Sequence, residues 1–456
     1  MMKKVSSAVG RSGKERRTGN WSVSLIVGIQ IVGIVLFSMA APGSVEALTF
    51  TVNSTLDETD TVHGDGVCRS ASGDCTLRAA IQEANWLDGP DSIKLNAGLY
   101  MLTIPGKEDF CASGDLDILS DGFGNDDLTI TGMGANKTFI NGGKLDRVFH
   151  ILSPVSVTIA KVTIQNGLAT EGGLSEALGG GILTTLESTL TLKECTISNN
   201  TASHTVDAKG GGIYSEGTLT ITKSTFWNNS ALCGRYSWGG GIYSRQAALT
   251  IRGSSLSNNS ASGNDSGLGG GICSFQSGST TITQCSLSSN SASGGQVGER
   301  AGHGGAIYNF DGALTITGSS LSNNSASGGG VGRGGGICND INMTIRTLTI
   351  ANSSLSNNSA SGGNGLGGGI CSGWAEVRIR RSTLSQNAAS GRSITGAGGG
   401  IYLSDGTLTV LDESKIIRNF SSDDGGGIYY SGSGGGTISA DSTVAKNIPY
   451  DIYPLP

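Results

Sequence analysis

Apolar and polar residues alternate with a period of two in short segments that recur along most of this chain. In residues 218–222, Leu219 and Ile221 alternate with three threonines, which predicts a strand with one buried side and one solvent-facing side. We expect the recurring apolar positions to form a continuous core. They are Leu128/Ile130, Val157/Ile159, Leu249/Ile251, Leu314/Ile316, Leu348/Ile350 and Leu408/Val410.

A glycine-rich strand opening precedes each alternating segment and recurs every 27 to 35 residues. The openings end at Ile182, Ile213, Ile242, Ile272, Ile307, Ile337, Ile370, Ile401 and Ile428. Length variation is concentrated in the Ser/Gly stretch that precedes the next glycines, which we interpret as an adjustable loop. A constant strand–turn–strand segment followed by a variable loop is typical of stacked coils, so the repeat predicts a parallel β-helix.

One asparagine closes each unit, and we expect these asparagines to form a ladder along the stack. Asparagine tolerates left-handed backbone angles, and stacked amides hydrogen-bond to one another. The ladder positions are Asn200, Asn229, Asn259, Asn290, Asn324, Asn358, Asn387, Asn419 and Asn447.

Composition agrees with a repeat protein and argues against one class of partner. The 456 residues include 75 glycines, and only 14% are charged and 5% aromatic, which is unusual for ordinary globular domains. The net charge of -6 and the pI of about 5.3 offer no basic surface for a phosphate backbone. We therefore expect no nucleic-acid partner.

The N-terminus is typical of an export signal. Six basic residues between Lys3 and Arg17 precede an uncharged stretch from Trp21 to Pro42, and small residues around Ala47 suit cleavage there. An uncleaved membrane anchor is the alternative, because about 20 apolar residues span a bilayer. We expect a secreted or cell-surface protein, outer-membrane display included, which contacts a membrane only through this segment if it is uncleaved.

Two groups of motifs resemble a known family. Residues 75–85, CTLRAAIQEAN, resemble the CSLREA motif at the head of exported β-helix proteins, with differences at Thr76 and Ala79. The segments 114–118 and 128–149 are similar to the first coils of those proteins. The sequences GGAIY at 304–308 and FWNN at 226–229 match the GGAI and FxxN signatures of polymorphic outer-membrane protein repeats, whereas most other copies read GGGI and LxxN.

The resemblance implies an all-β, right-handed parallel β-helix of the pectin-lyase-like kind over residues 48–453. We divide the chain into an export signal (1–47), a cap with the first coils (48–127), the β-helix repeats (128–447) and a C-terminal tail (448–456). Leu77, Ala80, Ile81 and Ala84 fall on one helical face, which predicts a short helix that caps the first coil. We interpret the charges of the same segment, at Arg78 and Glu83, as structural or solvated.

Nine cysteines in an exported chain indicate at least one disulfide and leave at least one thiol unpaired within the chain. Cys68 and Cys75, in a turn-rich segment, are the first candidate pair. Cys338 and Cys371 occupy equivalent positions on adjacent coils, and the expected stacking distance makes them the second candidate pair.

The sequence contains no recognisable catalytic site or metal site. Gly302-His303-Gly304 and Asp423-Asp424 imitate pieces of a polygalacturonase signature, but in the wrong order, so we interpret His303 as a loop residue. Two acidic runs are candidate calcium ligands, although neither has EF-hand spacing and solvated loops are the simpler interpretation. They contain Asp57, Glu58, Asp60 and Asp65, and Asp121, Asp126 and Asp127. We otherwise expect no cofactor.

The variable loops are the expected recognition surface, because one side of a solenoid varies without disturbing the stack. Aromatic and cationic residues that interrupt the NNSASG pattern suit sugar or protein binding. They are Arg235, Tyr236, Trp238, Arg300, His303 and Arg333. The sequence thus favours a structural or adhesive module that binds an extracellular carbohydrate or protein. The alternative is a polysaccharide lyase or glycoside hydrolase acting on the same edge.

Overall fold

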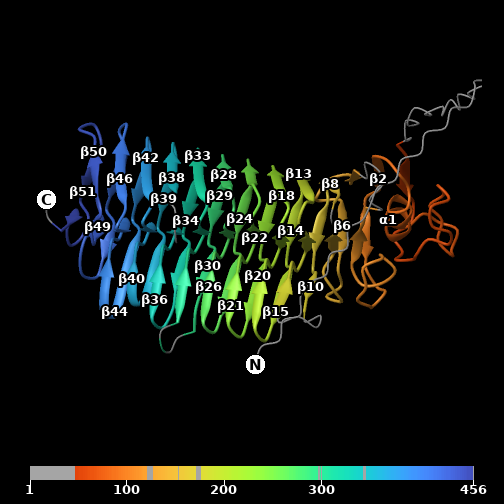
Figure 1. Ribbon diagram of the computed structural model, residues 1–456, viewed down its shortest axis with the longest axis horizontal. Coiled ribbons are helices and arrows are strands. Elements are labelled where there is room, and N and C mark those ends of the chain that lie inside the picture. Colours follow the sequence, from red (N-terminus) through yellow and green to blue (C-terminus); the bar gives the residue numbers. More distant parts are fainter. Residues whose placement is uncertain are drawn as a thin grey trace, which may run out of the picture. The chain divides into compact units, whose positions relative to one another are not determined.

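The computed structural model describes residues 47–120, 127–152, 154–170, 176–295, 298, 300–341 and 346–454. Within this part the chain winds through parallel, in-register sheets, and each coil adds one strand to each of three of them (Figure 1). A protruding arm forms a fourth sheet. The predicted export signal and the candidate calcium ligands Asp121 and Asp126 lie outside the described residues.

Sheet 1 follows the glycine-rich openings and begins in most coils with isoleucine. Its strands, in stacking order, are β4 (Leu116–Ile118), β7 (Phe149–Ile151), β12 (Ile182–Thr184), β17 (Ile213–Ser215), β22 (Ile242–Arg245), β27 (Ile272–Phe275), β32 (Ile307–Phe310), β37 (Ile337–Asp340), β41 (Ile370–Gly373), β45 (Ile401–Ser404), β49 (Ile428–Ser431) and β52 (Ile452–Tyr453).

Sheet 2 contains the alternating segments. Its strands are β1 (Thr49–Val52), β2 (Asp91–Leu95), β5 (Leu128–Thr131), β8 (Ser156–Ala160), β13 (Thr189–Lys193), β18 (Thr218–Thr222), β23 (Leu249–Arg252), β28 (Ser279–Thr283), β33 (Ala313–Thr317), β38 (Thr347–Ala351), β42 (Glu376–Arg380), β46 (Thr407–Leu411) and β50 (Gly435–Ile438).

Sheet 3 completes the main coil. Its strands are β3 (Gly98–Met101), β6 (Thr138–Asn141), β9 (Thr163–Gln165), β14 (Thr196–Ser198), β19 (Thr225–Trp227), β24 (Ser255–Ser257), β29 (Ser286–Ser288), β34 (Ser320–Ser322), β39 (Ser354–Ser356), β43 (Thr383–Ser385), β47 (Lys415–Ile417) and β51 (Thr443–Ala445).

The arm occupies the Ser/Gly stretches, so the prediction of adjustable loops there is wrong for the described residues. Outgoing strands are β10 (Leu168–Ala169), β15 (Thr201–His204), β20 (Ser230–Cys233), β25 (Ser260–Gly263), β30 (Ser291–Ser293), β35 (Ser325–Ser327) and β48 (Phe420–Ser421). Returning strands are β11 (Glu176–Leu178), β16 (Asp207–Lys209), β21 (Tyr236–Trp238), β26 (Ser266–Leu268), β31 (Ala301–His303) and β36 (Val331–Arg333). The long strands β40 (Ser359–Leu366) and β44 (Ala388–Ala397) run out and back.

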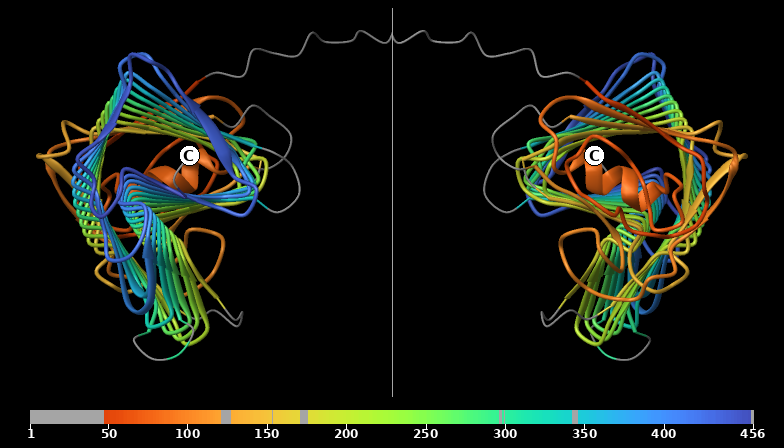
Figure 2. Two further views of the ribbon diagram at one scale, coloured as in Figure 1. Left: turned by 90° about the vertical axis from the view of Figure 1, so that its left-hand side faces the viewer. Right: turned by 90° about the vertical axis from the view of Figure 1, so that its right-hand side faces the viewer.

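Small residues allow the arm to be only two strands thick. All but the last of the outgoing strands bury an alanine, such as Ala292, and the returning strands from β26 onward place a glycine opposite it, whereas β11 and β16 place an alanine and β21 a serine there. A Cβ at Gly302 would overlap the backbone of both Ala292 and Ser327. Figure 2, viewed along the stack, shows the arm projecting from the main coil in successive turns. The alternation of alanine and serine therefore encodes a strand and not a loop.

The core fills the space inside the main coil and is continuous from coil to coil. In one turn Ile213, Leu219, Ile221 and Phe226 point inward from the three sheets, and all four are fully buried. The equivalent residues of neighbouring turns lie directly above and below them because the strands pair in register. The apolar columns expected from the sequence are this core.

The glycine triplets form the corner between the arm and sheet 1. Gly210 has a φ of 67°, a left-handed conformation that suits glycine. A Cβ on the next residue, Gly211, would overlap the carbonyl oxygens of Ser230 and Gly240. The triplet is therefore required both by the turn and by the close approach of neighbouring coils.

The asparagine ladder runs through the buried corner between sheet 3 and the arm. Each side-chain amide donates to Oδ1 of the next ladder asparagine, as Asn229 does to Asn259 at 3.0 Å, and also to a backbone carbonyl, that of Ile197 at 2.9 Å. The left-handed conformation, which the sequence assigned to the ladder residues, belongs instead to the residue before each of them, such as Asn228 with a φ of 56°. The ladder side chains are thereby turned inward.

The predicted capping helix is present as α1 (Leu77–Ala84), which lies across the first coil in Figure 2. Thr76 caps its N-terminus by accepting a hydrogen bond from the backbone N–H of Ala79. The helix is buried on nearly all sides, since Leu77 to Glu83 are all inaccessible to solvent. The predicted Cys68–Cys75 disulfide lies just before it.

The last coil includes residues that we assigned to a tail. Strand β52 pairs with β49, and Tyr453 stacks on Tyr429 with ring centroids 5.2 Å apart. Asp451 ends the asparagine ladder by accepting from the side-chain amide of Asn447. None of the described segments forms a helix that is both long enough and apolar enough to cross a membrane.

Candidate functional site

The returning strands of the arm pack against the outer face of sheet 1, and we call this contact the arm interface. The sheet contributes one outward residue per coil, and the arm contributes the last residue of each returning strand. The sheet column contains Leu183, Tyr214, Tyr243, Cys273, Tyr308, Cys338, Cys371 and Tyr402. The arm column contains Leu178, Lys209, Trp238, Leu268, His303, Arg333, Leu366 and Ala397.

The structure therefore brings together three of the six predicted recognition residues, because Trp238, His303 and Arg333 occupy equivalent positions on β21, β31 and β36. Arg235 lies in the turn at the outer end of the arm, 5.2 Å from the ring of Tyr236 and 3.8 Å from a carboxylate oxygen of Asp265. Arg300 immediately precedes β31. The predicted surface is thus divided between the arm interface and the outer edge of the arm.

Aromatic packing closes the arm interface near Trp238. Its ring meets Phe275 edge-on at 5.5 Å and Tyr243 at 6.3 Å, and Phe275 stacks on Phe310 at 5.0 Å. Contacts of this kind stabilise the arm against the main coil. The indole of Trp238 therefore lies inside the interface, where it packs the arm against sheet 1.

His303 lies on strand β31 and its side chain packs inward, so its assignment to a loop is wrong. Its Nδ1 is 3.8 Å from the Cys338 sulfur and 3.9 Å from Oδ2 of Asp340, and the sulfur is 3.6 Å from the same carboxylate. Burial lowers the pKa of the His303 imidazole to about 4 and raises the pKa of the Cys338 thiol well above its usual range. At neutral pH the pair is uncharged, which is the opposite of an activated cysteine nucleophile.

Cys338 and Cys371 are register partners, but both are free thiols, so the predicted disulfide between them is wrong. In-register parallel strands hold equivalent side chains about 4.8 Å apart and pointing the same way. A disulfide needs Cβ atoms about 3.8 Å apart. Cys68–Cys75, which is closed by a turn, does not face this restriction.

A cavity of about 330 Å³ adjoins the His303 cluster at the arm interface. Its walls combine aromatic rings with one cation and one carboxylate, the mixture typical of sites for polar, ring-shaped ligands. The Nε of Arg333 is buried without a hydrogen-bond partner among the described residues, whereas Trp374 is 63% exposed. The principal lining residues are Phe310, Arg333, Asp340, Leu366, Trp374 and Tyr402.

A longer and shallower groove of about 840 Å³ follows the corner between sheets 2 and 3. Serine, threonine and amide side chains line it over several coils, with Lys223 and Arg381 as its charged residues. It contains no carboxylate, so it offers no acid–base pair for glycoside chemistry.

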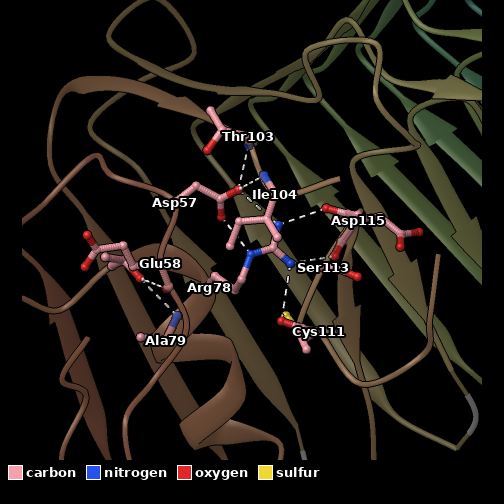
Figure 3. A network of polar contacts seen from close by, with 12 residues as sticks. Asp57, Glu58, Arg78, Ala79, Thr103, Ile104, Cys111, Ser113 and Asp115 are labelled. Atoms are coloured by element: carbon pink, nitrogen blue, oxygen red, sulfur yellow. Dashed lines mark hydrogen bonds and ion pairs between the residues drawn. The ribbon is translucent and has the colours of Figure 1, made fainter. Parts of the chain in front are cut away.

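The acidic residues that we considered as calcium ligands around Asp57 are engaged in structural contacts. Arg78 is buried, and its Nε donates to Oδ1 of Asp57 at 2.7 Å, while the rest of the guanidinium donates to the carbonyls of Cys111, Gly114 and Asp115 (Figure 3). The other carboxylates of this run accept nearby hydrogen bonds: Glu58 from Ser72, Asp60 from Val62 and Arg69, and Asp65 from Val67.

Comparison with known proteins agrees with the geometry of the coils. The family model described as a right handed beta helix region matches residues 126–303. The fold is a right-handed parallel β-helix. No curated protein matches the chain.

Two solved structures show a distant likeness. The A-module of a mannuronan C-5 epimerase from Azotobacter vinelandii is 12% identical with a TM-score of 0.28, over 84% of this chain and 98% of that one. A pectin methylesterase in complex with a hexasaccharide is 11% identical with a TM-score of 0.20, over 83% and 90%. Similarity at this level says nothing about the residues of the arm interface.

Proposed function

We propose that this chain is a secreted or cell-surface β-helix module that binds an extracellular carbohydrate in the cavity of the arm interface, without catalysis. Trp374, Phe310 and Tyr402 offer apolar faces for sugar rings, and the Arg333 side chain in the same wall suits a carboxylate-bearing sugar. The combination of an arginine side chain with three aromatic rings around one cavity is the observation that carries the proposal. Export rests on the basic and apolar N-terminal segment, and on the resemblance to exported β-helix proteins.

Binding is favoured over hydrolysis because the described lining of the cavity lacks a pair of carboxylates. Asp340 is the one carboxylate among its described lining residues, whereas glycoside hydrolases use two carboxylates about 5 to 9.5 Å apart. The neighbouring thiol and imidazole are both neutral at pH 7. A rigid cavity on a stacked scaffold needs none of these groups to bind a polymer.

The test measures binding and chemistry on the same polymers. The purified chain is applied to immobilised polygalacturonate and hyaluronan, which are acidic, and to neutral dextran and galactan, and the supernatant is assayed for unsaturated products and new reducing ends. We expect retention on an acidic polymer without product. Product formation would establish the lyase or hydrolase alternative, and the absence of retention on every polymer would overturn carbohydrate binding in favour of a protein partner.

Two variants locate the binding site. Trp374→Ala is expected to weaken affinity about 3- to 10-fold through lost stacking, and Arg333→Gln about 10- to 100-fold through a lost charge-assisted contact. Matched controls are Trp227→Ala, another partly exposed tryptophan on sheet 3, and Arg252→Gln, an exposed arginine on sheet 2. Equal effects of controls and cavity variants would place the ligand elsewhere.

A further inference from the structure

A second cluster of potential ligands lies near the N-terminal end of the stack, far in sequence from the arm interface. Asp117 on β4 and His150 on β7 are register partners in adjacent coils of sheet 1. Asp109, in the segment between β3 and β4, extends toward the same point. One ligand atom from each of the three side chains lies within 4.8 Å of the other two.

Two buried atoms of this cluster lack a well-aligned hydrogen bond. Oδ1 of Asp117 and Nδ1 of His150 are inaccessible to solvent and lie 3.4 Å apart, within ion-pair distance, but neither makes a well-aligned hydrogen bond within the described structure. The side chain of Asp117 is fully buried and that of His150 is 10% exposed. Leaving such atoms without a hydrogen bond is destabilising, and more so for a charged group than for a neutral one. The arrangement therefore calls for a species that both atoms can bind.

The spacing of these atoms fits one metal ion. Nδ1 of His150 is 3.3 Å from Oδ1 of Asp109 and 3.4 Å from Oδ1 of Asp117. Two ligand atoms bound at about 2.0–2.1 Å and separated by the tetrahedral angle lie about 3.3–3.4 Å apart. If Nδ1 of His150 instead carried a proton, it could donate that proton in a hydrogen bond to only one of the two carboxylates. An imidazole with two carboxylates is a ligand set for zinc-like ions, whereas calcium takes oxygen ligands.

The surrounding residues hold the carboxylates in place. Oδ2 of Asp117 accepts a hydrogen bond from the backbone N–H of Cys111 at 2.8 Å, which leaves Oδ1 directed at His150. Arg78 donates to the carbonyls of Cys111, Gly114 and Asp115, so the cap helix anchors the segment between Asp109 and Asp117 (Figure 3). Hydrogen bonds of this kind fix the orientation of metal ligands.

The local charge also favours a cation. The adjoining cavity of about 210 Å³ is lined by Glu108, Asp109, Asp115 and Asp146, against Lys107 and Arg147. Arg147 is already paired, 3.2 Å from Oδ2 of Asp115. The cluster of His303, Cys338 and Asp340 is less suitable, because its nitrogen–oxygen distance is 3.9 Å and the Arg333 guanidinium lies beside it.

We propose that Asp109, Asp117 and His150 bind a divalent transition-metal ion of the zinc type, which clamps the segment after β3 onto the first coils of the β-helix. Zinc commonly takes three protein ligands and a water molecule. Since the ligands come from a connecting segment and two adjacent coils, the ion stabilises the capped end of the stack. The site is independent of carbohydrate binding at the arm interface.

The test titrates the full chain, stripped with chelator and dialysed, with Zn²⁺ by calorimetry and counts bound metal by elemental analysis. We expect one zinc ion per chain at this site and a zinc-dependent rise in melting temperature. Asp109→Asn, whose side chain is 65% exposed and whose change therefore leaves the core intact, should weaken zinc affinity at least about tenfold. Asp117→Asn should do the same.

Controls separate this site from other zinc-binding groups. Asp412→Asn changes a partly exposed carboxylate near the other end of the stack, and Cys338→Ser removes the thiol of the His303 cluster; both variants should retain full zinc affinity. The cobalt-substituted protein should show ligand-field bands without a thiolate charge-transfer band, because the ligands are nitrogen and oxygen. The proposal is overturned if the wild-type chain binds no zinc, if Asp109→Asn binds it unchanged, or if the cobalt spectrum contains the thiolate band.

Discussion

The side-chain amide of Asn290 donates to Oδ1 of Asn324 at 3.0 Å, and the backbone N–H of Asn290 donates to the same oxygen at 3.0 Å. Asn324 in turn donates to Oδ1 of Asn358 and to the carbonyl of Leu287. Each ladder residue thus satisfies polar groups of three coils, in a corner from which water is excluded. The hydrogen bonds of the ladder are continuous along the stack, so removing one asparagine leaves polar groups of both neighbouring coils without a partner.

The first prediction concerns this ladder. Asn324→Ala is expected to lower the free energy of unfolding by about 3 kcal/mol or more, because it leaves several buried donors and acceptors without partners. Urea denaturation followed by circular dichroism measures the effect. The matched control is Asn323→Gly at the adjacent exposed position, where a φ of 57° suits glycine and the change should be close to neutral. Equal losses in the two variants would contradict the role of the ladder.

The second prediction concerns the glycine corners. Gly211→Ala should destabilise the protein by at least about 2–3 kcal/mol, because the new methyl group would overlap backbone atoms of Ser230 and Gly240, which cannot move without separating the coils. Gly278→Ala is the control, since a Cβ there meets no atom within 4 Å. The measurement compares the thermal unfolding midpoints of the two variants. Equal midpoints for Gly211→Ala and Gly278→Ala would contradict the close packing of the corner.

The third prediction concerns pH. Because burial lowers the pKa of His303 to about 4, the unfolded chain binds more protons than the folded chain between about pH 6.5 and 4. The stabilising effect of keeping His303 neutral is present above pH 6.5 and is lost as the pH falls toward 4, by up to about 1.4 kcal/mol per pH unit. The measurement compares the urea unfolding midpoints of the wild type and His303→Gln across this pH range. Carboxylates titrate in both proteins, so the difference between the two curves reports His303 alone. Parallel curves for the two proteins would argue against it.

The fourth prediction concerns cysteine. Seven of the nine cysteines are free and buried, so titration of the unreduced, denatured chain should give seven thiols, and the native chain should react much more slowly. Mass spectrometry of the unreduced peptides should join Cys68 to Cys75. A count of five thiols, with Cys338 joined to Cys371, would mean that the coils approach more closely than in-register stacking allows.

Part of the arm interface could be predicted from the sequence. Trp238, His303 and Arg333 stand out because they interrupt a monotonous serine pattern, and they share one column of the arm. Their partners Cys338 and Asp340 are found only when the returning strands are known to fold against sheet 1. The sequence did contain a signal for this second layer, because tyrosine or cysteine follows the isoleucine in most units. A regular column of such residues on the outer side of a sheet predicts that this side is also buried.

The sequence by itself determined the coils of this protein, because period-two alternation, glycine corners and one asparagine per turn are local patterns that act through adjacent coils. Tertiary structure alone decided what lies outside the main coil. Serine–alanine stretches fold back as a two-layered arm because only small residues, alanine, glycine and serine, meet between its two layers. The same packing brings His303 to Cys338, and in-register stacking places Asp117 beside His150. No local sequence pattern encodes these contacts, because they join residues of different coils and the length of a coil varies.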